Sequence, residues 1–115
     1  MVIRQGDVIW VSFPPPRGSE PAGHRPAVVI QCDAFNLSRI NTIVVAAVTS
    51  QLKYESMPGN VRLNKGEAGM PKPSVINVSQ IHSIDRSYVE SRLGSLTHER
   101  LLQVKEGLGT VFGIR

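Results

Sequence analysis

The residues best suited to chemistry lie in one segment rich in glycine and proline, residues 18–26. Within it, Glu20, His24 and Arg25 stand only a few positions apart. The guanidinium of Arg25 stays protonated at neutral pH, so it suits the stabilisation of negative charge on a phosphate better than the removal of a proton. Carboxylate and imidazole side chains ordinarily titrate at or below neutral pH, so Glu20 or His24 could accept that proton. This segment could therefore act on a phosphate group.

A second polar pair, Thr49 and Ser50, directly follows the most apolar run of the chain, residues 43–48. At the end of a buried strand, the Thr49 hydroxyl could donate a hydrogen bond to a phosphate oxygen. Two simpler interpretations stay open on the residues alone. Arg25 could pair with Glu20 across its own loop, and Thr49 could serve only as a β-branched strand former.

The chain is mildly basic, and arginine carries most of the excess. Its 115 residues hold 13 Lys and Arg against 9 Asp and Glu, a formal net charge of +4. Nine of the 13 are arginine, whose guanidinium makes forked contacts to phosphate oxygens. Nucleic acid is a plausible partner, although a mildly basic soluble protein would carry the same charge.

Several other chemistries are missing from the sequence. It contains no P-loop, H-E-x-x-H, C-x-x-C or G-x-S-x-G motif. The single cysteine, Cys32, cannot form an internal disulfide, and we expect it to be buried. The three histidines are scattered, so neither a metal site nor a cofactor is expected. No apolar stretch is long enough for a membrane span or a signal peptide, which favours a cytoplasmic location.

Proline and glycine divide the chain into short strands of one domain, residues 1–115. Strands are predicted over residues 8–13, 27–30, 42–49, 60–63 and 75–84 and around 91–93, with helical turns possible at 33–41 and 85–90. The strand 42–49 is the most apolar and should lie at the centre of the sheet. Trp10 and Phe13 are expected in the core. Residues 14–25 and 51–58 would form two long loops.

Near the C-terminus the hydrophobic period changes from that of strands to that of a helix. Thr97 is a suitable N-cap for this helix. Its apolar positions are Leu101, Val104, Leu108 and Val111 or Phe112. Gly107 and Gly109 should weaken it by about 1 kcal/mol each. The expected fold is mainly β (α+β), a small bent antiparallel sheet or barrel with an amphipathic C-terminal helix.

In order and spacing, short motifs along nearly the whole chain resemble the MazF/PemK family of toxin endoribonucleases from toxin–antitoxin systems. The matching motifs are Gly6-Asp7-Val8, Gly18-Ser19-Glu20, Arg25-Pro26, residues 28–36, Thr49-Ser50, Ser74-Val75 through Gln80-Ile81, and Ile84-Asp85. The resemblance implies an SH3-like antiparallel β-barrel with a C-terminal helix, a homodimer, and metal-independent cleavage of single-stranded RNA at short motifs. It also implies a cognate antitoxin that occupies the RNA groove with an extended peptide, and DNA binding as the antitoxin complex.

Carried over by position, the principal catalytic arginine of the family falls on Arg25 and its catalytic threonine on Thr49. Glu20 matches another functional position. Cleaving RNA without a metal requires the ribose 2′-OH to attack the adjacent phosphorus, and a guanidinium can stabilise the charge that develops. The resemblance favours Glu20 as the base, with His24 as a local alternative.

Further residues are expected to contact RNA. They are Ser19, His24, Ser50, Lys53, Tyr54, Asn77, Ser79 and Gln80. Some branches of the family carry an Arg and an Asp where Asn77 and Ser79 stand here, so these two and Gln80 are candidate readers of base edges. Alternatively, Asn77 and Ser79 are ordinary solvent-facing strand residues. Lys53 and Tyr54 offer a charge for phosphate and a ring for stacking on one wall of the groove.

Two other functions remain alternatives to an endoribonuclease toxin. One is a non-catalytic RNA-binding module with a basic groove. The other is a toxin of the same fold that targets a protein, as the gyrase-poisoning toxins do, although those lack the pairing of Arg25 with Thr49.

Overall fold

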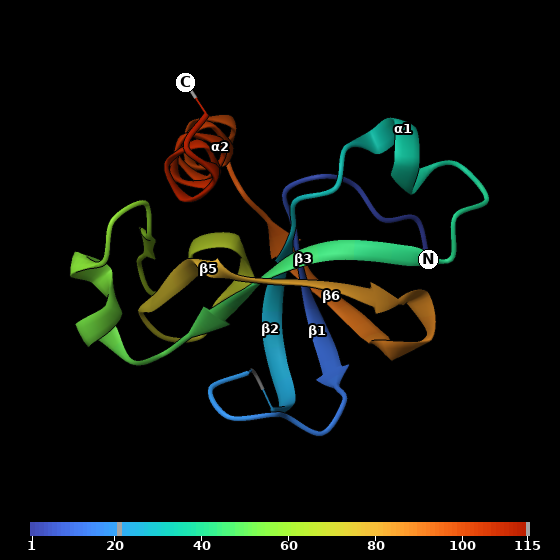
Figure 1. The fold of residues 1–115 in the computed structure, drawn as a ribbon, viewed down its shortest axis with the longest axis horizontal. Helices are drawn as coiled ribbons and strands as arrows, with labels where there is room; N and C mark the ends of the chain where they lie inside the picture. The colour runs from blue at the N-terminus through green and yellow to red at the C-terminus, as the bar shows by residue number, and fades with distance from the viewer. Residues whose placement is uncertain (21, 115) are drawn as a thin grey trace.

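The protein is built on one six-stranded antiparallel sheet that curls into a half-barrel (Figure 1). The computed structural model describes residues 1–20 and 22–114; Pro21, part of the predicted first loop, and Arg115 lie outside the described residues. The strands are β1 (Asp7–Phe13), β2 (Gly23–Val29), β3 (Thr42–Thr49), β4 (Val61–Leu63), β5 (Ser74–Asp85) and β6 (Val89–Ser95). The helices are α1 (Asp33–Asn36) and α2 (His98–Phe112), with 3₁₀ turns η1 (Leu52–Ser56), η2 (Glu67–Gly69) and η3 (Arg86–Tyr88).

Strand order across the sheet is β4-β5-β3-β2-β1-β6, so β3 lies inside the sheet and β4 and β6 are its edges. The prediction of a mainly β fold with a bent antiparallel sheet and a C-terminal helix is confirmed. The predicted central strand, 42–49, is also confirmed, and its bounds coincide with those of β3. Its neighbours are β2 and β5, both antiparallel to it.

A break in register bends β5 at residues 77–80. Ala46 of β3 faces Ile81, whereas Val48, two positions on, faces Ile76, so five steps along β5 match two along β3. The backbone N–H of Val78, within the bend, donates to Oδ1 of Asn60 over 3.0 Å. Irregularities of this kind increase curvature and redirect side chains, and here they curl the sheet.

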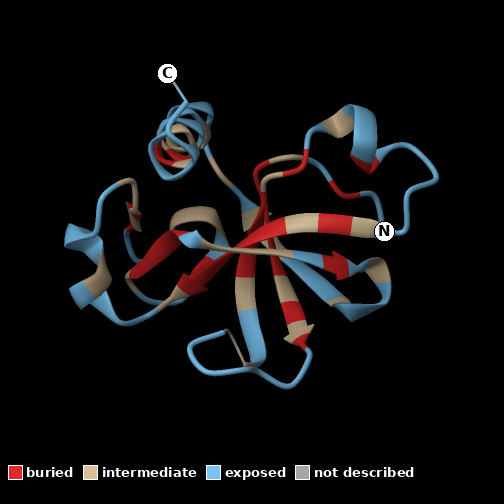
Figure 2. Cartoon of the chain, in the orientation of Figure 1, coloured by how far each residue is buried: buried red, intermediate tan, exposed pale blue. Residues whose placement is uncertain are grey.

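Curling buries apolar side chains on both faces of the sheet. Figure 2 shows the buried residues along the strands. One core lies under α2 and includes Val8, Val28 and Val104. The other lies on the opposite face and includes Ile9, Val29 and Ile84. Adjacent residues of one strand thus enter different cores, as the two-residue period of a strand requires.

Helix α2 begins as predicted, with Oγ1 of Thr97 accepting a hydrogen bond from the backbone N–H of Arg100. Val104 is buried, but Val111 and Phe112 are 41% and 59% exposed. The prediction that they extend the packed face is wrong, because the apolar packing of the helix against the core reaches only as far as Leu108.

Gly107 has a packing role that its low helix propensity conceals. A Cβ atom there would lie 2.1 Å from the carbonyl oxygen of Gly59, and a Cβ on Gly59 would meet the Gly107 oxygen at 2.9 Å. The helix backbone therefore rests directly on the backbone of the segment before β4. The predicted weakness of Gly107 is offset by this close approach.

Three further predictions are corrected. Strand β2 begins at Gly23 rather than at residue 27, because residues 23–26 pair with Trp10–Phe13 of β1. The first loop is correspondingly shorter. Cys32 is exposed, not buried, since it only precedes the short helix α1, whose buried anchor is Asn36. Residues 51–58 are not an irregular loop throughout, because they contain η1.

In the part of the chain that is described, no helix has the length and apolar character needed to cross a membrane.

Candidate active site

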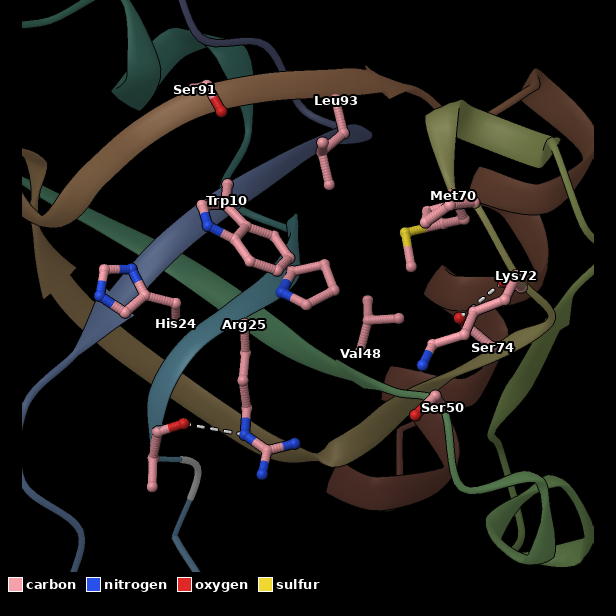
Figure 3. A pocket seen from close by; sticks show the side chains of 13 residues that line it. Trp10, His24, Arg25, Val48, Ser50, Met70, Lys72, Ser74, Ser91 and Leu93 are labelled. Atoms are coloured by element: carbon pink, nitrogen blue, oxygen red, sulfur yellow. Dashed lines mark hydrogen bonds between the residues drawn. The ribbon is translucent and has the colours of Figure 1, made fainter.

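Arg25 lies on β2 opposite Val11 of β1, so its backbone is held in the sheet rather than in a loop. Its side chain is exposed, and Nε donates a hydrogen bond to the backbone oxygen of Ala22 over 2.9 Å (Figure 3). This bond fixes the direction of the guanidinium, and Nε is its only atom with a hydrogen bond among the described residues. Arg25 lines two neighbouring cavities, which also share Val48.

The smaller of these, which we call the Arg25–Thr49 cavity, has a volume of about 140 Å³. Its lining residues are Ser19, Glu20, Arg25, Ala47, Val48, Thr49, Gln51, Tyr54, Asn77 and Gln80. All three residues expected to be catalytic are among them, together with four of the eight expected to contact RNA. Residues from β2, β3, β5 and two loops thus meet at one polar hollow.

Thr49 reaches this cavity from the end of a strand, whereas Glu20 reaches it from a loop. Thr49 ends β3, and its Oγ1 accepts the backbone N–H of Gln51 over 3.1 Å, which leaves the hydroxyl proton available to a ligand. Glu20 lies on the exposed loop, where its Oε1 accepts the backbone N–H of Arg17 over 2.6 Å. Among the described residues Glu20 and Arg25 form no ion pair, so the simple pairing across the loop is not found.

The bend of β5 supplies the polar wall. Asn77 is only 8% exposed, so the interpretation of it as a solvent-facing residue is wrong. Its Oδ1 accepts a hydrogen bond from the Ser79 hydroxyl over 2.9 Å. Gln80 donates from Nε2 to the backbone oxygen of Ser19 over 2.8 Å, which ties the first loop to β5. Ser79 is exposed and lines a separate shallow hollow beside Gln80.

Tyr54 is held in place by Asn60, a residue that we did not single out from the sequence. Nδ2 of Asn60 donates to the backbone oxygen of Tyr54 over 2.9 Å, while its Oδ1 accepts from Val78 in the bend. One amide thereby joins η1 to β5. The only signal in the sequence is an asparagine at the first position of the predicted strand 60–63. The Lys53 amine lies 5.2 Å from the Tyr54 ring centroid, but Lys53 is not among the lining residues of either cavity.

The second cavity, which we call the Trp10 pocket, is larger, about 600 Å³, and more apolar. Figure 3 shows Trp10, His24, Arg25 and Met70 around it. Trp10 is half-buried in this wall, so the prediction that it belongs to the core is wrong, whereas Phe13 is buried as expected. His24 and Ser50 line this pocket instead of the smaller one.

His24 is engaged by a carboxylate on another strand. Its Nδ1 lies 2.8 Å from Oε2 of Glu90 on β6, the neighbour of β1 at the edge of the sheet. Of the two candidate bases, only Glu20 therefore lines the same cavity as Arg25 and Thr49.

The geometry suits the binding of an anion with a proton acceptor close to it. A guanidinium and a hydroxyl can donate hydrogen bonds to phosphate oxygens, and a carboxylate on the same cavity can accept a proton. Within residues 1–20 and 22–114, no three His, Cys, Asp or Glu side chains gather where they could hold a metal ion.

Comparison with known proteins shows one family along nearly the full chain. The model of the family described as PemK-like, MazF-like toxin of type II toxin-antitoxin system matches residues 4–112. Endoribonuclease MazF2 of Mycobacterium bovis is 36% identical over 114 residues, which cover 99% of this chain and 100% of the relative. Endoribonuclease MazF of Staphylococcus epidermidis is 33% identical, with coverage of 98% and 93%.

Solved structures agree with the sequence relatives. The crystal structure of MazF from Deinococcus radiodurans superposes with a TM-score of 0.83 at 28% identity, covering 99% of each chain. A MazE–MazF complex from the same organism gives a TM-score of 0.77 at 28% identity, covering 100% of this chain and 99% of the other.

Proposed function

We propose that this chain, which belongs to the family of PemK-like, MazF-like toxins of type II toxin–antitoxin systems, is a toxin endoribonuclease that cleaves single-stranded RNA. The observation that supports this most is the meeting of Arg25, Thr49 and Glu20 at one cavity of about 140 Å³. These three side chains lie on different segments of the chain, and the fold brings them to a single polar hollow.

The proposed reaction needs no metal ion. The ribose 2′ oxygen attacks the adjacent phosphorus, the bond from phosphorus to the 5′ oxygen breaks, and the products are a 2′,3′-cyclic phosphate and a 5′-hydroxyl. Arg25 stabilises the charge on the non-bridging oxygens, and Thr49 donates a hydrogen bond to one of them. Glu20 takes the 2′-OH proton, and a solvent proton completes the leaving 5′-hydroxyl. Glu20 is favoured over His24 because it shares the cavity with Arg25 and Thr49.

RNA recognition is assigned to the walls around this centre. Ser19, Tyr54, Asn77 and Gln80 line the Arg25–Thr49 cavity, which supports the proposal that they contact the nucleotide bound there. Amide groups can read the exposed edges of single-stranded bases, so Asn77 and Gln80 are proposed to set the preferred RNA motif. Lys53 stands outside both cavities and is proposed to attract the phosphate backbone from further away.

The family also suggests partners. A structure of MazE with MazF is among the similar structures, which supports a cognate antitoxin for this chain. We propose that an extended antitoxin peptide occupies the RNA groove, that the toxin is a homodimer, and that the toxin–antitoxin complex binds DNA in the cytoplasm.

Incubation of the purified protein with mixed RNA in the presence of EDTA tests the activity. Discrete fragments are expected, and Arg25→Ala should reduce the rate by about 100- to 1000-fold, as for the loss of a group that stabilises developing negative charge. Arg39→Ala, which removes an exposed arginine of the loop before β3, is the charge-matched control and should cleave at the wild-type rate.

Intact RNA with the wild-type protein would contradict the proposal. Retention of RNA without cleavage would favour the non-catalytic RNA-binding module. Failure to bind RNA together with inhibition of gyrase would favour the protein-targeting toxin. Equal rates for wild type and Arg25→Ala would show that the cavity is not the catalytic centre.

A further inference from the structure

The Trp10 pocket borders the proposed catalytic centre but takes no part in the reaction assigned to it. Arg25 lines both cavities, so a ligand whose phosphate contacts this guanidinium also stands at the mouth of the Trp10 pocket. The pocket has about four times the volume of the Arg25–Thr49 cavity, 600 against 140 Å³. Pockets that enclose small organic ligands usually span about 300–1000 Å³, so only the larger cavity falls within that range.

The walls of the pocket combine apolar surface with positive charge. Trp10, Pro26 and Met70 contribute apolar surface, and Arg25 and Lys72 contribute cations. No carboxylate is among its described lining residues. An aromatic face beside cations is the combination that binds a nucleobase together with its phosphate, since any base can stack and the cation meets the backbone.

The position of Trp10 in the sheet explains why its ring is available. Its neighbours along β1, Ile9 and Val11, are fully buried in one core, so the indole points to the other face. Across the sheet, Trp10 is paired with Pro26 of β2 and Ser91 of β6. Both also line the Trp10 pocket, and neither has a long side chain that could reach across it.

The opposite side of the pocket is held by the segment before β5. Ser74 is fully buried, and its hydroxyl donates to the backbone oxygen of Lys72 over 3.0 Å (Figure 3). This contact fixes the backbone from which the Lys72 side chain enters the pocket. The guanidinium of Arg25 thus reaches the pocket from β2, and the amine of Lys72 reaches it from the segment before β5.

We infer that the Trp10 pocket binds the nucleobase adjacent to the scissile phosphate, by stacking on Trp10, while Lys72 contacts the next phosphate. This rests on the proposed function. It divides the substrate between the two cavities: the reacting phosphate lies between Arg25 and Thr49, and one flanking base is withdrawn into the larger pocket. An apolar peptide side chain would fill the same walls but would leave the charges of Arg25 and Lys72 unmatched.

Trp10 is the single tryptophan of the chain, so its fluorescence reports this pocket alone. The substrate is an RNA whose cut site has been mapped with the wild-type protein, made uncleavable by a 2′-deoxy sugar at that site. Binding is followed by anisotropy of a dye on the RNA end, and stacking by quenching of Trp10 emission. A series of such RNAs carries one abasic site at each position around the cut.

We expect intact RNA to quench Trp10. One abasic position next to the cut should abolish the quenching and weaken binding by about 5- to 150-fold, the range measured for base–aromatic stacking. Trp10→Leu should weaken the binding of intact RNA to a similar extent. In this variant the abasic substitution should cause no further loss of affinity, whereas Trp10→Phe should retain most of the affinity for intact RNA. Phe112→Leu, a change at an exposed ring on α2, is the matched control.

Lys72→Ala keeps the inference testable if Trp10→Leu fails to fold, because it should weaken binding at low salt and leave the quenching by saturating RNA in place. RNA that binds by anisotropy without changing Trp10 emission would overturn the inference and leave the proposed function standing. Quenching that survives every abasic substitution would overturn it as well, since another group would then fill the pocket. Failure of the wild-type protein to cleave or bind any RNA would refute the proposed function itself.

Discussion

Replacement of Gly107 by alanine tests whether helix α2 depends on close backbone contact with the segment before β4. The added Cβ would lie 2.1 Å from the Gly59 carbonyl oxygen, about 1.3 Å inside the 3.4 Å at which ordinary contact begins. The obstructing atom is backbone, so it cannot swing aside as the end of a flexible side chain could. Gly59 itself has a φ of 85°, a left-handed conformation that favours glycine, so both sides of this contact depend on a residue without a Cβ.

Two opposing effects determine the size of the change. Alanine in place of glycine stabilises a helix by about 1 kcal/mol. Forcing an extra group into a packed interior costs about 1–3 kcal/mol. Because the backbone itself would have to shift by this distance, the cost should lie at the upper end of that range. The net loss in free energy of unfolding should therefore be about 2 kcal/mol. For a domain of this length, that corresponds to a fall in Tm of roughly 8 °C.

Gly109→Ala provides the matched control on the same helix. Its Cβ would meet the Ile114 oxygen at 2.9 Å, but Ile114 is exposed near the chain end and can move. The helix-propensity gain should then remain, so this variant is expected to be within about 1 kcal/mol of wild type. Urea unfolding at equal protein concentration measures both variants. If Gly107→Ala proves as stable as Gly109→Ala, the backbone contact does not restrain the helix.

Four further variants probe other parts of the molecule. The Arg100 guanidinium, hydrogen-bonded to Glu67, lowers the pKa of Glu67 below its usual 4.5, so the pair stabilises the fold above about pH 4.5 and is lost as pH falls through the folded pKa. Glu67→Gln should cost about 1 kcal/mol at pH 7 and flatten the acid side of a stability–pH profile; an unchanged profile would contradict this. Lys53→Ala should weaken RNA binding and reduce its salt slope while cut-site choice stays the same, whereas Asn77→Ala should alter the cut sites found by fragment-end sequencing. Asn60→Ala should reduce kcat/KM for RNA more than it reduces Tm, because the amide joins η1 to the bend of β5; a loss of Tm with unchanged kcat/KM would assign it a purely structural role.

Local patterns in the sequence predicted a strand or helix correctly where its own residues determine its structure. The apolar run before Thr49 has no competing signal, so the limits of β3 follow from it directly. Thr97 likewise caps α2 through a bond within its own turn. Residue types singled out Arg25, Glu20 and Thr49, the family resemblance assigned their roles, and the fold brings seven of the candidate residues to one hollow.

The features that the sequence did not reveal all depend on contacts between distant segments. Residues 23–26 contain glycine and proline and read as loop, and only pairing with β1 makes them a strand. Gly107 reads as a weak helix residue until Gly59 is seen beneath it. Asn60 bonds to Val78, 18 positions away, so no local pattern marks it. Trp10 reads as core because nothing in its own strand shows that its cross-strand neighbours are small.

The placement of Arg25 on a strand, with Glu20 on a loop, has a consequence for how the proposed site operates. Arg25 is held by the β1–β2 pairing and by its bond to Ala22, so the position of its charge is set before substrate arrives. Electrostatic stabilisation is most effective when the charged group needs no rearrangement, and this arrangement meets that condition. Glu20 is held instead by the backbone N–H of Arg17 within its own exposed loop, and that loop is tied to β5 by the contact of Gln80 with Ser19. A ligand that displaces this contact would move the base while the arginine stayed in place, so proton transfer could be altered without loss of phosphate binding.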